Sequence, residues 1–311
     1  MSALIVDVLC GGPGREAEVS RRSGAAIAEG LRCGGHDVRL IEVGQRLDAA
    51  ALRPGSVVFN IIHGTYGEDG TLQAELEALG RRFVGSDSAV SRLCMDKQAT
   101  KQRLAEAGVR VPWGVAVRLG TPFRPSDFKL PHLGPLVMKP RDDGSSVGLR
   151  MVPNPSFLIP AAEELLREVG DRAYLIEERL SGPEYTCAVL GDGDAVEALP
   201  PIAIAAAGGV FDYHAKYHAA DTREVPVGDP SLAQRLMDVA VQAHRACGCR
   251  DLSRTDIMGT ADGGLAVLEI NTLPGFTGAS LTPKAAAAAG IAFPQLVDRL
   301  VRRAAARGIP R

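Results

Sequence analysis

Short apolar runs and longer segments with helical spacing alternate along the first part of the chain. The runs at residues 3–10, 38–43 and 57–62 are rich in Val, Ile and Leu and predict buried strands. Residues 20–33 and 71–79 carry apolar side chains at helical spacing, and each segment is followed by glycine. This alternation predicts a parallel sheet with crossover helices.

The middle of the chain has shorter and less regular elements. Helices are predicted at residues 96–107 and 160–169, and strands at 136–139, 174–178 and 185–190. Residues 120–135 carry four prolines and predict an irregular connection. Residues 205–228 have no clean period. A long irregular loop inside a compact domain is usually functional or disordered, and the charged and aromatic residues of this loop favour a function.

Two helical patterns and two strands mark the last third of the chain. A helix with one apolar stripe begins after Asp229, and Phe293 to Val301 form the last amphipathic helix. Between them, two segments that end near Asp256 and Asn271 predict short strands. For 311 residues we expect about two domains, with a boundary near residue 95.

The amino-acid composition is typical of a globular protein and disfavours binding to nucleic acid. A hydrophobic content of 46% and a charged content of 23% are ordinary for a soluble globular protein. The net charge of -2 gives no basic field for nucleic acid, and 5% aromatic residues argue against a surface that stacks single-stranded bases. No segment resembles a signal peptide or is long enough to cross a bilayer, so we expect a reducing cytoplasm.

Six cysteines are scattered along the chain. Cys247 and Cys249 form a C-x-C pair with no second pair, which disfavours a zinc site. We therefore expect all six to be reduced, small and buried.

The strongest chemical signal is a group of polar side chains at the ends of two apolar strands. Asp256, Glu269 and Asn271 offer two carboxylates and one amide oxygen, with Arg254 beside them. Glu269 and Asn271 are two residues apart, so on a strand they face the same side. Hard oxygen ligands that do not close a cage suit Mg²⁺ shared with the phosphates of a nucleotide.

Two other interpretations of this group remain open. A paired-carboxylate acid–base site fits less well, because the amide of Asn271 cannot act as a base. A solvated loop at a strand end is the plainer interpretation. It leaves unexplained why a run as apolar as residues 265–270 ends in such a cluster.

A loop of small residues, from Gly144 to Gly148, follows the predicted strand that ends in Lys139. Backbone N–H groups of such a loop can approach phosphate oxygens while the lysine supplies positive charge. Alone the signal is weak, because glycine–serine turns usually join hairpin strands. The chain has no complete P-loop motif, and the segment at residues 12–16 lacks the third glycine of a dinucleotide site.

Three glutamates and one histidine are weaker candidates. Glu177, Glu178 and Glu184 surround a predicted turn between strands, where backbone groups can meet an adenine edge and a carboxylate can accept ribose hydroxyls. Taken alone, they are better explained as surface glutamates. His63 follows the third strand, where parallel sheets bind ligands, although a lone histidine is more often structural.

Taken in order, these segments resemble the ATP-grasp ligases, and most closely the D-alanine–D-alanine ligase family. The resemblance covers essentially the whole chain, and the combination of strings is specific although no single string is. The matching strings are GGPGRE from Gly11 with EVS from Glu18, HGTYGEDGTLQ from His63, VGS from Val84, MDK from Met95, KPRDDGSSVGL from Lys139, IEERLSGPEYT from Ile176, DYHAKY from Asp212, RTD from Arg254, LEINTLPGFT from Leu268 and SLTPKAA from Ser280.

The resemblance implies an α/β protein with an α+β ATP-grasp part. An N-terminal domain with a parallel α/β sheet, residues 1–95, would bind substrate. A two-lobed ATP-grasp fold would follow, with a central lobe at residues 96–180 and a C-terminal lobe at residues 181–311. The C-terminal lobe would carry the metal site and a lid loop at residues 205–221.

The activity that the resemblance implies has two steps. The carboxylate of one D-alanine attacks the γ-phosphate of ATP, giving an acyl phosphate and ADP. The amine of a second D-alanine displaces phosphate and forms the D-alanyl-D-alanine of peptidoglycan precursors. The implied cofactors are two ions of Mg²⁺ or Mn²⁺. The implied state is a cytoplasmic homodimer with no nucleic-acid or membrane partner.

The resemblance assigns one set of residues to ATP and its metal ions. The phosphates would be bound by Lys97, Lys139 and Lys216. The adenine and ribose would be bound by Glu177, Leu180 and Glu184. The metal ligands would be Asp256, Glu269 and Asn271.

A second set would bind the substrates and stabilise the reaction. Glu16 would hold the ammonium of the first D-alanine, with His63 as a further substrate contact. Ser280 and the Leu281 backbone would bind the second carboxylate. Arg254 and the Gly275 N–H would be the oxyanion donors. Ser145 and Tyr217 would form a hydrogen-bonded chain with Glu16 and lock the lid, which keeps water from the acyl phosphate.

The chain departs from the family pattern at a few positions. Arg179 stands where the family usually has an aromatic or aliphatic residue against adenine. Its guanidinium plane could stack there, or ATP could bind more loosely. Thr255 replaces the usual apolar residue before Asp256. Tyr217 is retained, which favours the plain dipeptide over ester-linked or D-serine products.

Two alternatives stand beside this prediction. An enzyme of the same fold could join D-alanine to another D-amino or hydroxy acid, depending on the pocket near residues 280–284. The chain could also be a nucleotide-binding module without turnover. Such a module would be expected to lack a metal ligand or a cation, whereas the three metal ligands, Arg254 and the three lysines are all present.

Overall fold

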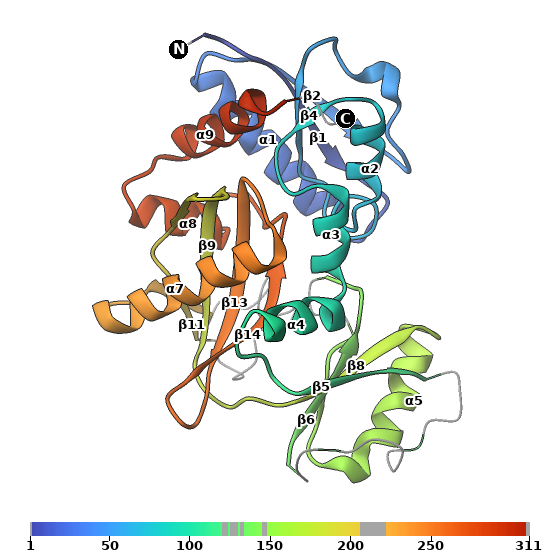
Figure 1. Ribbon diagram of the computed structural model, residues 1–311. Coiled ribbons are helices and arrows are strands. Elements are labelled where there is room, and N and C mark those ends of the chain that lie inside the picture. The colour runs from blue at the N-terminus through green and yellow to red at the C-terminus, as the bar shows by residue number, and fades with distance from the viewer. Residues whose placement is uncertain are drawn as a thin grey trace.

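The computed structural model describes residues 2–119, 124, 130, 134–144, 148–205 and 222–308. Within these ranges the chain forms three sheets, one after another along the sequence. Figure 1 shows the first sheet at one end, the second at the other, and the third between them. One sheet is parallel and two are antiparallel, so the predicted α/β class with an α+β part is confirmed.

The first sheet has the order β2-β1-β3-β4, and all its strand pairs are parallel. The strands are β1 (Ile5–Gly11), β2 (Asp37–Val43), β3 (Val57–Asn60) and β4 (Arg82–Phe83), joined by α1 (Ala17–Cys33), the short 3₁₀ turn η1 (Ala49–Ala51) and α2 (Thr71–Ala78). Every residue of β1 after Ile5 is buried, because a central parallel strand is covered on both faces. The parallel sheet predicted from the alternating periods is confirmed.

The second sheet has the order β5-β8-β6-β7 and is antiparallel. Its strands are β5 (Gly114–Arg118), β6 (Leu136–Pro140), β7 (Arg150–Val152) and β8 (Ala173–Glu178), with η3 (Pro155–Phe157) leading into α5 (Leu158–Glu168). Apolar residues of α5, such as Leu158 and Leu165, pack onto this sheet. Most of the predicted irregular connection at residues 120–135 lies outside the described residues.

The third sheet has the order β12-β11-β9-β13-β14, with β10 paired to β9, and is antiparallel. Its strands are β9 (Glu184–Asp192), β10 (Ala195–Ala198), β11 (Ile202–Ala205), β12 (Arg223–Pro226), β13 (Leu252–Gly259) and β14 (Leu265–Asn271). Helix α7 (Pro230–Cys247) packs on it and begins at Asp229, whose carboxylate caps the first turn. Strand β12 lies inside the segment predicted as an irregular loop, of which residues 206–221 are outside the described ranges.

Two consecutive helices lead from the first sheet to the second. α3 (Ser88–Met95) and α4 (Lys97–Glu106) meet at Asp96, whose carboxylate caps α4 and pairs with Arg141 just after β6. The Lys97 N–H donates to the Arg141 carbonyl at 3.0 Å. These bonds hold the first turn of α4 against the end of β6.

The last two helices return to the first sheet. α8 (Leu281–Ala288) and α9 (Phe293–Ala306) follow the third sheet, and α9 contacts α1, β3 and β4. Buried side chains of α9, such as Leu296 and Leu300, share one core with Val8 and Ile27. Figure 1 shows α9 beside α1. The end of the chain therefore completes the core around the first sheet.

All six cysteines are free thiols. Five are buried, as predicted, but Cys33 is exposed because it lies in the last turn of α1, off the apolar stripe that faces the core. Across the described ranges, no helix combines the length and the apolar character that a membrane crossing needs.

Candidate active site

Strands β13 and β14 bring four predicted side chains to one place. In their antiparallel pairing, Arg254 lies opposite Asn271 and Asp256 lies opposite Glu269. Arg254 donates from Nε and Nη2 to the two oxygens of Asp256, at 2.9 and 2.8 Å. Because both residues are on one strand, two positions apart, this bidentate pair needs no ordering of a distant segment.

The Asp256 carboxylate is held from two further directions. Thr186 on β9 donates its hydroxyl to Oδ1 at 2.6 Å, and Asn271 donates Nδ2 to Oδ2 at 3.1 Å. Asp256 is 6% exposed, so these bonds replace the water that the carboxylate loses on burial. The strand register shifts just after Asp256, and such irregularities re-aim side chains beside active sites. The prediction that a strand ends near Asp256 is wrong, because β13 continues to Gly259; Asn271 does end β14. We call Thr186, Arg254, Asp256, Glu269 and Asn271, which lie around this end of β14, the strand-end cluster.

The chemistry of the strand-end cluster fits a hard divalent cation. The candidate donors are the carboxylates of Asp256 and Glu269 and the amide oxygen of Asn271, which are the oxygen types that Mg²⁺ and Mn²⁺ prefer. Among the residues that the structure describes, no group of three or more His, Cys, Asp and Glu side chains is arranged to hold a metal. A cation held here by two carboxylates and an amide would therefore complete its shell with phosphate or water oxygens.

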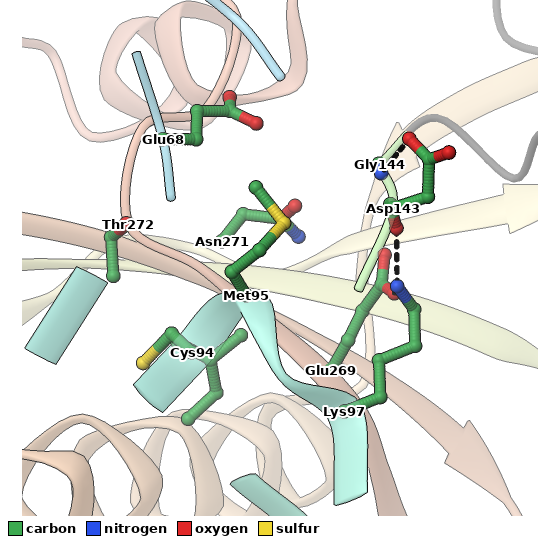
Figure 2. Close-up of a pocket in the computed structure, with 10 residues that line it drawn as sticks. Glu68, Cys94, Met95, Lys97, Asp143, Gly144, Glu269, Asn271 and Thr272 are labelled. Atoms are coloured by element: carbon green, nitrogen blue, oxygen red, sulfur yellow. Dashed lines mark hydrogen bonds and ion pairs between the residues drawn. The ribbon is translucent and has the colours of Figure 1, made fainter. Parts of the chain in front are cut away.

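A small cavity lies beside the strand-end cluster, and Figure 2 shows the side chains around it. Its walls come from four separate segments of the chain, with Glu68, Cys94, Met95, Lys97, Asp143, Gly144, Glu269, Ile270, Asn271 and Thr272. Three of the predicted site residues are among them, namely Lys97, Glu269 and Asn271. The fold thus joins the start of α4, the loop after β6 and the end of β14.

Lys97 extends from the first turn of α4 toward Glu269 and the loop after β6 (Figure 2). Its Nζ donates to the Asp143 carbonyl and lies 4.0 Å from Glu269 Oε2. Burial lowers the pKa of Lys97; the charge of Glu269 opposes this change, and the charge of Lys139 adds to it. An anion that entered the cavity would therefore stabilise the charged form of Lys97.

A second charged group lies where α4 meets β6 and β8. Glu177 on β8 is 3% exposed, and each of its carboxylate oxygens meets a lysine. Lys139 Nζ on β6 lies 2.5 Å from Oε1, and Lys101 Nζ on α4 donates to Oε2. Both lysines are also buried. We call Lys101, Lys139 and Glu177 the lysine–carboxylate cluster.

The charges of the lysine–carboxylate cluster shift each other's pKa values. Burial would raise the pKa of Glu177, but Lys101 and Lys139 together outweigh burial and hold this pKa below its usual value. Burial would lower the pKa of Lys139, but the attraction of Glu177 and Glu269 outweighs it and raises this pKa. Glu177 is therefore ionised at neutral pH.

His63 and Glu16 lie next to the loop that follows β6. His63 Nδ1 lies 3.0 Å from Glu68 Oε1. Burial lowers the pKa of His63, but Glu68 and then Glu16 raise it by more. A Cβ atom on Gly144 would lie 3.8 Å from a carboxylate oxygen of Glu16 and from one of Glu68. Glu16 is therefore close to the small-residue loop, of which residues 145–147 are outside the described ranges.

Gly275 and Ser280 lie together just before α8. A Cβ atom on Gly275 would be 2.9 Å from Ser280 Oγ, so any other residue at this position would require the Ser280 side chain to shift. Ser280 Oγ accepts the Thr277 N–H at 3.0 Å, and α8 begins at the next residue, Leu281. The first turn of a helix attracts negative charge, which agrees with the carboxylate contact predicted for Ser280 and Leu281.

The predicted adenine contacts surround the turn between β8 and β9. Leu180 is half-buried in that turn, and Glu184 begins β9. Glu184 is near enough to Lys139 for its charge to contribute to the raised pKa of that lysine, after Glu177 and Glu269. Arg179 is exposed, and its backbone N–H donates to the Pro135 carbonyl at 3.0 Å.

Three predicted site residues lie outside the described residues, namely Ser145, Lys216 and Tyr217. Their roles stay predictions.

Sequence reasoning did not single out three residues that the structure adds to the site, namely Glu68, Lys101 and Thr186. A signal was present for two of them. Lys101 lies one helical turn after Lys97, and Thr186 lies two strand positions after Glu184, so each shares a face with a predicted residue.

Comparison with known proteins identifies relatives along the whole chain. The family model described as D-ala D-ala ligase C-terminus matches residues 129–302, and the one described as D-ala D-ala ligase N-terminus matches residues 42–86. A D-alanine–D-alanine ligase from Anaeromyxobacter sp. (strain Fw109-5) is 41% identical over 307 residues, 96% of this chain and 96% of that protein. Another from Cupriavidus necator is 39% identical over 303 residues, 96% of this chain and 91% of that protein.

Solved structures agree with these matches. The D-alanine–D-alanine ligase from Bacillus anthracis complexed with ATP has a TM-score of 0.84 and 34% identity, over 98% of this chain and 97% of that one. The VanG D-Ala:D-Ser ligase from Enterococcus faecalis has a TM-score of 0.85 and 28% identity, over 97% of this chain and 100% of that one. The resemblance drawn from the sequence is confirmed.

Proposed function

Because the chain belongs to the D-ala D-ala ligase family, we propose that it joins two molecules of D-alanine to D-alanyl-D-alanine while ATP becomes ADP and phosphate. The dipeptide would serve peptidoglycan precursor synthesis. The observation that carries the proposal is the strand-end cluster, in which Arg254, Thr186 and Asn271 all bond Asp256 beside the cavity that Lys97 lines.

The first step is the attack of one D-alanine carboxylate on the γ-phosphate of ATP. Phosphoryl transfer depends on positioned positive charge more than on a protein nucleophile. Lys97 and Lys139 would bind the phosphates, together with Lys216. Asp256, Glu269 and Asn271 would hold two ions of Mg²⁺ or Mn²⁺, which when bound neutralise charge on the phosphates.

The first D-alanine would be held at the side of the site formed by Glu16 and His63. The Glu16 carboxylate suits the substrate ammonium. The raised pKa of His63 favours a protonated ring, which can donate to the substrate. Ser145 and Tyr217 would connect Glu16 to a lid at residues 205–221, and closure would keep water from the acyl phosphate.

In the second step, the amine of the second D-alanine attacks the acyl phosphate and phosphate leaves. The carbonyl oxygen becomes negative in the tetrahedral intermediate, and Arg254 with the Gly275 N–H would donate to it. The bidentate bond to Asp256 fixes the guanidinium plane of Arg254 before substrate arrives. Ser280 and the Leu281 backbone would bind the second carboxylate.

The remaining proposals concern the binding of adenine and ribose, the roles of the three parts of the chain, and the oligomeric state. Glu177, Leu180 and Glu184 would hold the adenine and ribose of ATP. The three predicted parts, residues 1–95, 96–180 and 181–311, would act as substrate domain, central lobe and C-terminal lobe. We propose a cytoplasmic homodimer.

One observation favours testing a second acceptor. The fold is as similar to a D-Ala:D-Ser ligase as to a D-alanine–D-alanine ligase, with TM-scores of 0.85 and 0.84. The decisive experiment measures phosphate release from ATP with D-alanine alone, and with D-serine or D-lactate added, followed by mass analysis of the product. We expect D-alanyl-D-alanine to dominate in every mixture, with L-alanine inactive. A mixed product in excess would establish the other acceptor, and ATP binding without phosphate release would establish a non-catalytic module.

A further inference from the structure

Lys101 is a buried cation that no step of the proposed reaction uses. It lies on α4 one turn after Lys97, is 4% exposed, and donates to Glu177 Oε2. A buried ammonium is unfavourable unless an opposite charge compensates it. Lys101 and Glu177 therefore depend on each other for burial.

The two lysines on Glu177 have different surroundings. Lys139 lies 2.5 Å from Glu177, but the charges of Glu269 and Glu184 also act on it. The negative charges that act most on Lys101 are those of Glu177 and Glu178. The charges of Glu177 and of Glu269 in the strand-end cluster therefore both act on Lys139, whereas the main negative charges on Lys101 are those of Glu177 and its neighbour Glu178.

If Lys139 binds a phosphate, it no longer neutralises the charge of Glu177. The single charge of Lys139 can neutralise either this carboxylate or a phosphate group. Glu177 is fixed in the sheet, because it lies on β8 between Gly114 of β5 and Val137 of β6, and it is 3% exposed. A buried carboxylate that loses its cation is strongly destabilised.

We propose that Lys101 is a positioning residue that keeps the Glu177 carboxylate neutralised while Lys139 turns to the phosphates of ATP. The inference rests on the proposed function, because it assumes that Lys139 meets ATP phosphates in this site. One ion pair is exchanged for another, and no covalent bond changes. With Lys101 in place, ATP binds without protonation of Glu177.

The test is calorimetric binding of ATP to Lys101→Met, which needs no turnover. We expect the dissociation constant for ATP to rise about tenfold or more, because Lys139 must now stay with Glu177 or leave it unpaired. Binding should also take up about one proton more than binding to the native chain, since protonation is the remaining way to neutralise Glu177. Proton uptake is measured by repeating the titration in buffers with different heats of ionisation. Affinity should improve more steeply as the pH falls than it does in the native chain.

Two variants separate charge from structure. Lys101→Arg keeps the cation and should bind ATP within about threefold of the native chain, without additional proton uptake. Arg103→Met removes one positive charge from the exposed side of the same helix, and should leave ATP affinity unchanged. Thermal unfolding of each variant shows whether it is folded.

A double variant, Lys101→Met with Glu177→Gln, keeps the test decisive even if Lys101→Met alone is unstable. In the Glu177→Gln background there is no carboxylate to neutralise, so adding Lys101→Met should not weaken ATP binding further. An equal loss of affinity in both backgrounds, or a Lys101→Met protein that binds ATP normally, would overturn the inference.

Failure of the proposed function looks different: the native chain would bind ATP, respond to Lys101→Met as described, and yet form no dipeptide.

Discussion

The strand-end cluster and the lysine–carboxylate cluster both neutralise a buried carboxylate, but with different kinds of partner. Asp256 is held by Arg254, Thr186 and Asn271, whose short or planar side chains come from three adjacent strands. Glu177 is held by two lysines with long flexible side chains, one from a helix and one from a strand. The first set is fixed in direction, and the second can exchange partners.

The difference follows from what each region would do. A site that stabilises a developing charge works best when its donors already point to that charge and need no rearrangement. A site that admits a triphosphate needs cations that can leave one anion for another. The two clusters should therefore respond differently to substitution: geometry should matter in the first, and net charge in the second.

The largest effect is expected for Glu269→Gln in the strand-end cluster. It removes one negative charge with little change of shape, so metal-dependent phosphate release from ATP should fall by roughly 1,000-fold or more. Glu197→Gln on the exposed strand β10 removes a similar charge away from the site and should have no effect. Normal phosphate release from the Glu269 variant would exclude this residue as a metal ligand.

Arg254→Lys tests geometry at constant charge. Lysine cannot form the bidentate bond to Asp256, so we expect kcat for dipeptide formation to fall about 100-fold. The matched control is Arg110→Lys, because Arg110 also bonds both oxygens of one carboxylate, Asp262, but does so at the surface. If both variants retain kcat within about twofold, the fixed direction of Arg254 is not important for the reaction.

Thr186→Val tests the support behind Asp256. It removes the hydroxyl that donates to Asp256 Oδ1 at 2.6 Å, and we expect the metal concentration for half-maximal activity to rise about tenfold. The neighbouring Thr255→Val is a close control, because Thr255 Oγ1 is buried and has no hydrogen-bond partner among the described residues. That control should leave the metal requirement unchanged. Equal responses of the two variants would assign the effect to general packing.

The smallest effect on catalysis is expected at His244, which lies outside both clusters. Burial lowers its pKa to about 4, and its ring bonds Ser253 Oγ at 2.7 Å. The unfolded chain takes up a proton near the usual pKa of 6.5 and the folded chain near 4, so the free energy of unfolding should fall by roughly 3 kcal/mol as the pH drops through this window.

Urea unfolding of the native chain and of His244→Gln between these two pH values isolates that contribution. The variant should lose most of this pH dependence, with kcat at neutral pH nearly unchanged. A variant that keeps the full slope would show that other groups cause it.

The elements that could be predicted from sequence are long enough to show a repeating pattern of apolar residues. α1, α7, β1 and β14 each carry a sustained apolar pattern, and the structure has them near the predicted bounds. β4 has two residues and β7 has three, too few to show a period, and they are strands because neighbouring strands pair with them. α8 was missed because its alanine-rich sequence has little difference between its faces.

The residues of the candidate site could be selected from the sequence, but several of their partners could not. Arg254 and Asp256 share one face of β13, Glu269 and Asn271 share one face of β14, and the pairing of these consecutive strands brings the four together. Thr186 and Asp256 are 70 residues apart and meet only because β9 pairs with β13. Lys101 and Glu177 are 76 residues apart and meet because α4 contacts the second sheet. Such contacts depend on strand order and helix docking, which no local pattern encodes.

The return of α9 to the first sheet also has a consequence for synthesis on the ribosome. Gly30 of α1 lies so close to Phe293 and Val297 of α9 that a Cβ atom there would be 3.1 Å from both side chains. A nascent chain that emerges at about 5 to 20 residues per second exposes α1 for tens of seconds before α9 is made. The side of α1 that α9 covers, as opposed to the side on β1 and β2, is uncovered during that interval. We therefore expect the earliest-made part of this enzyme to be among the last to complete its native packing.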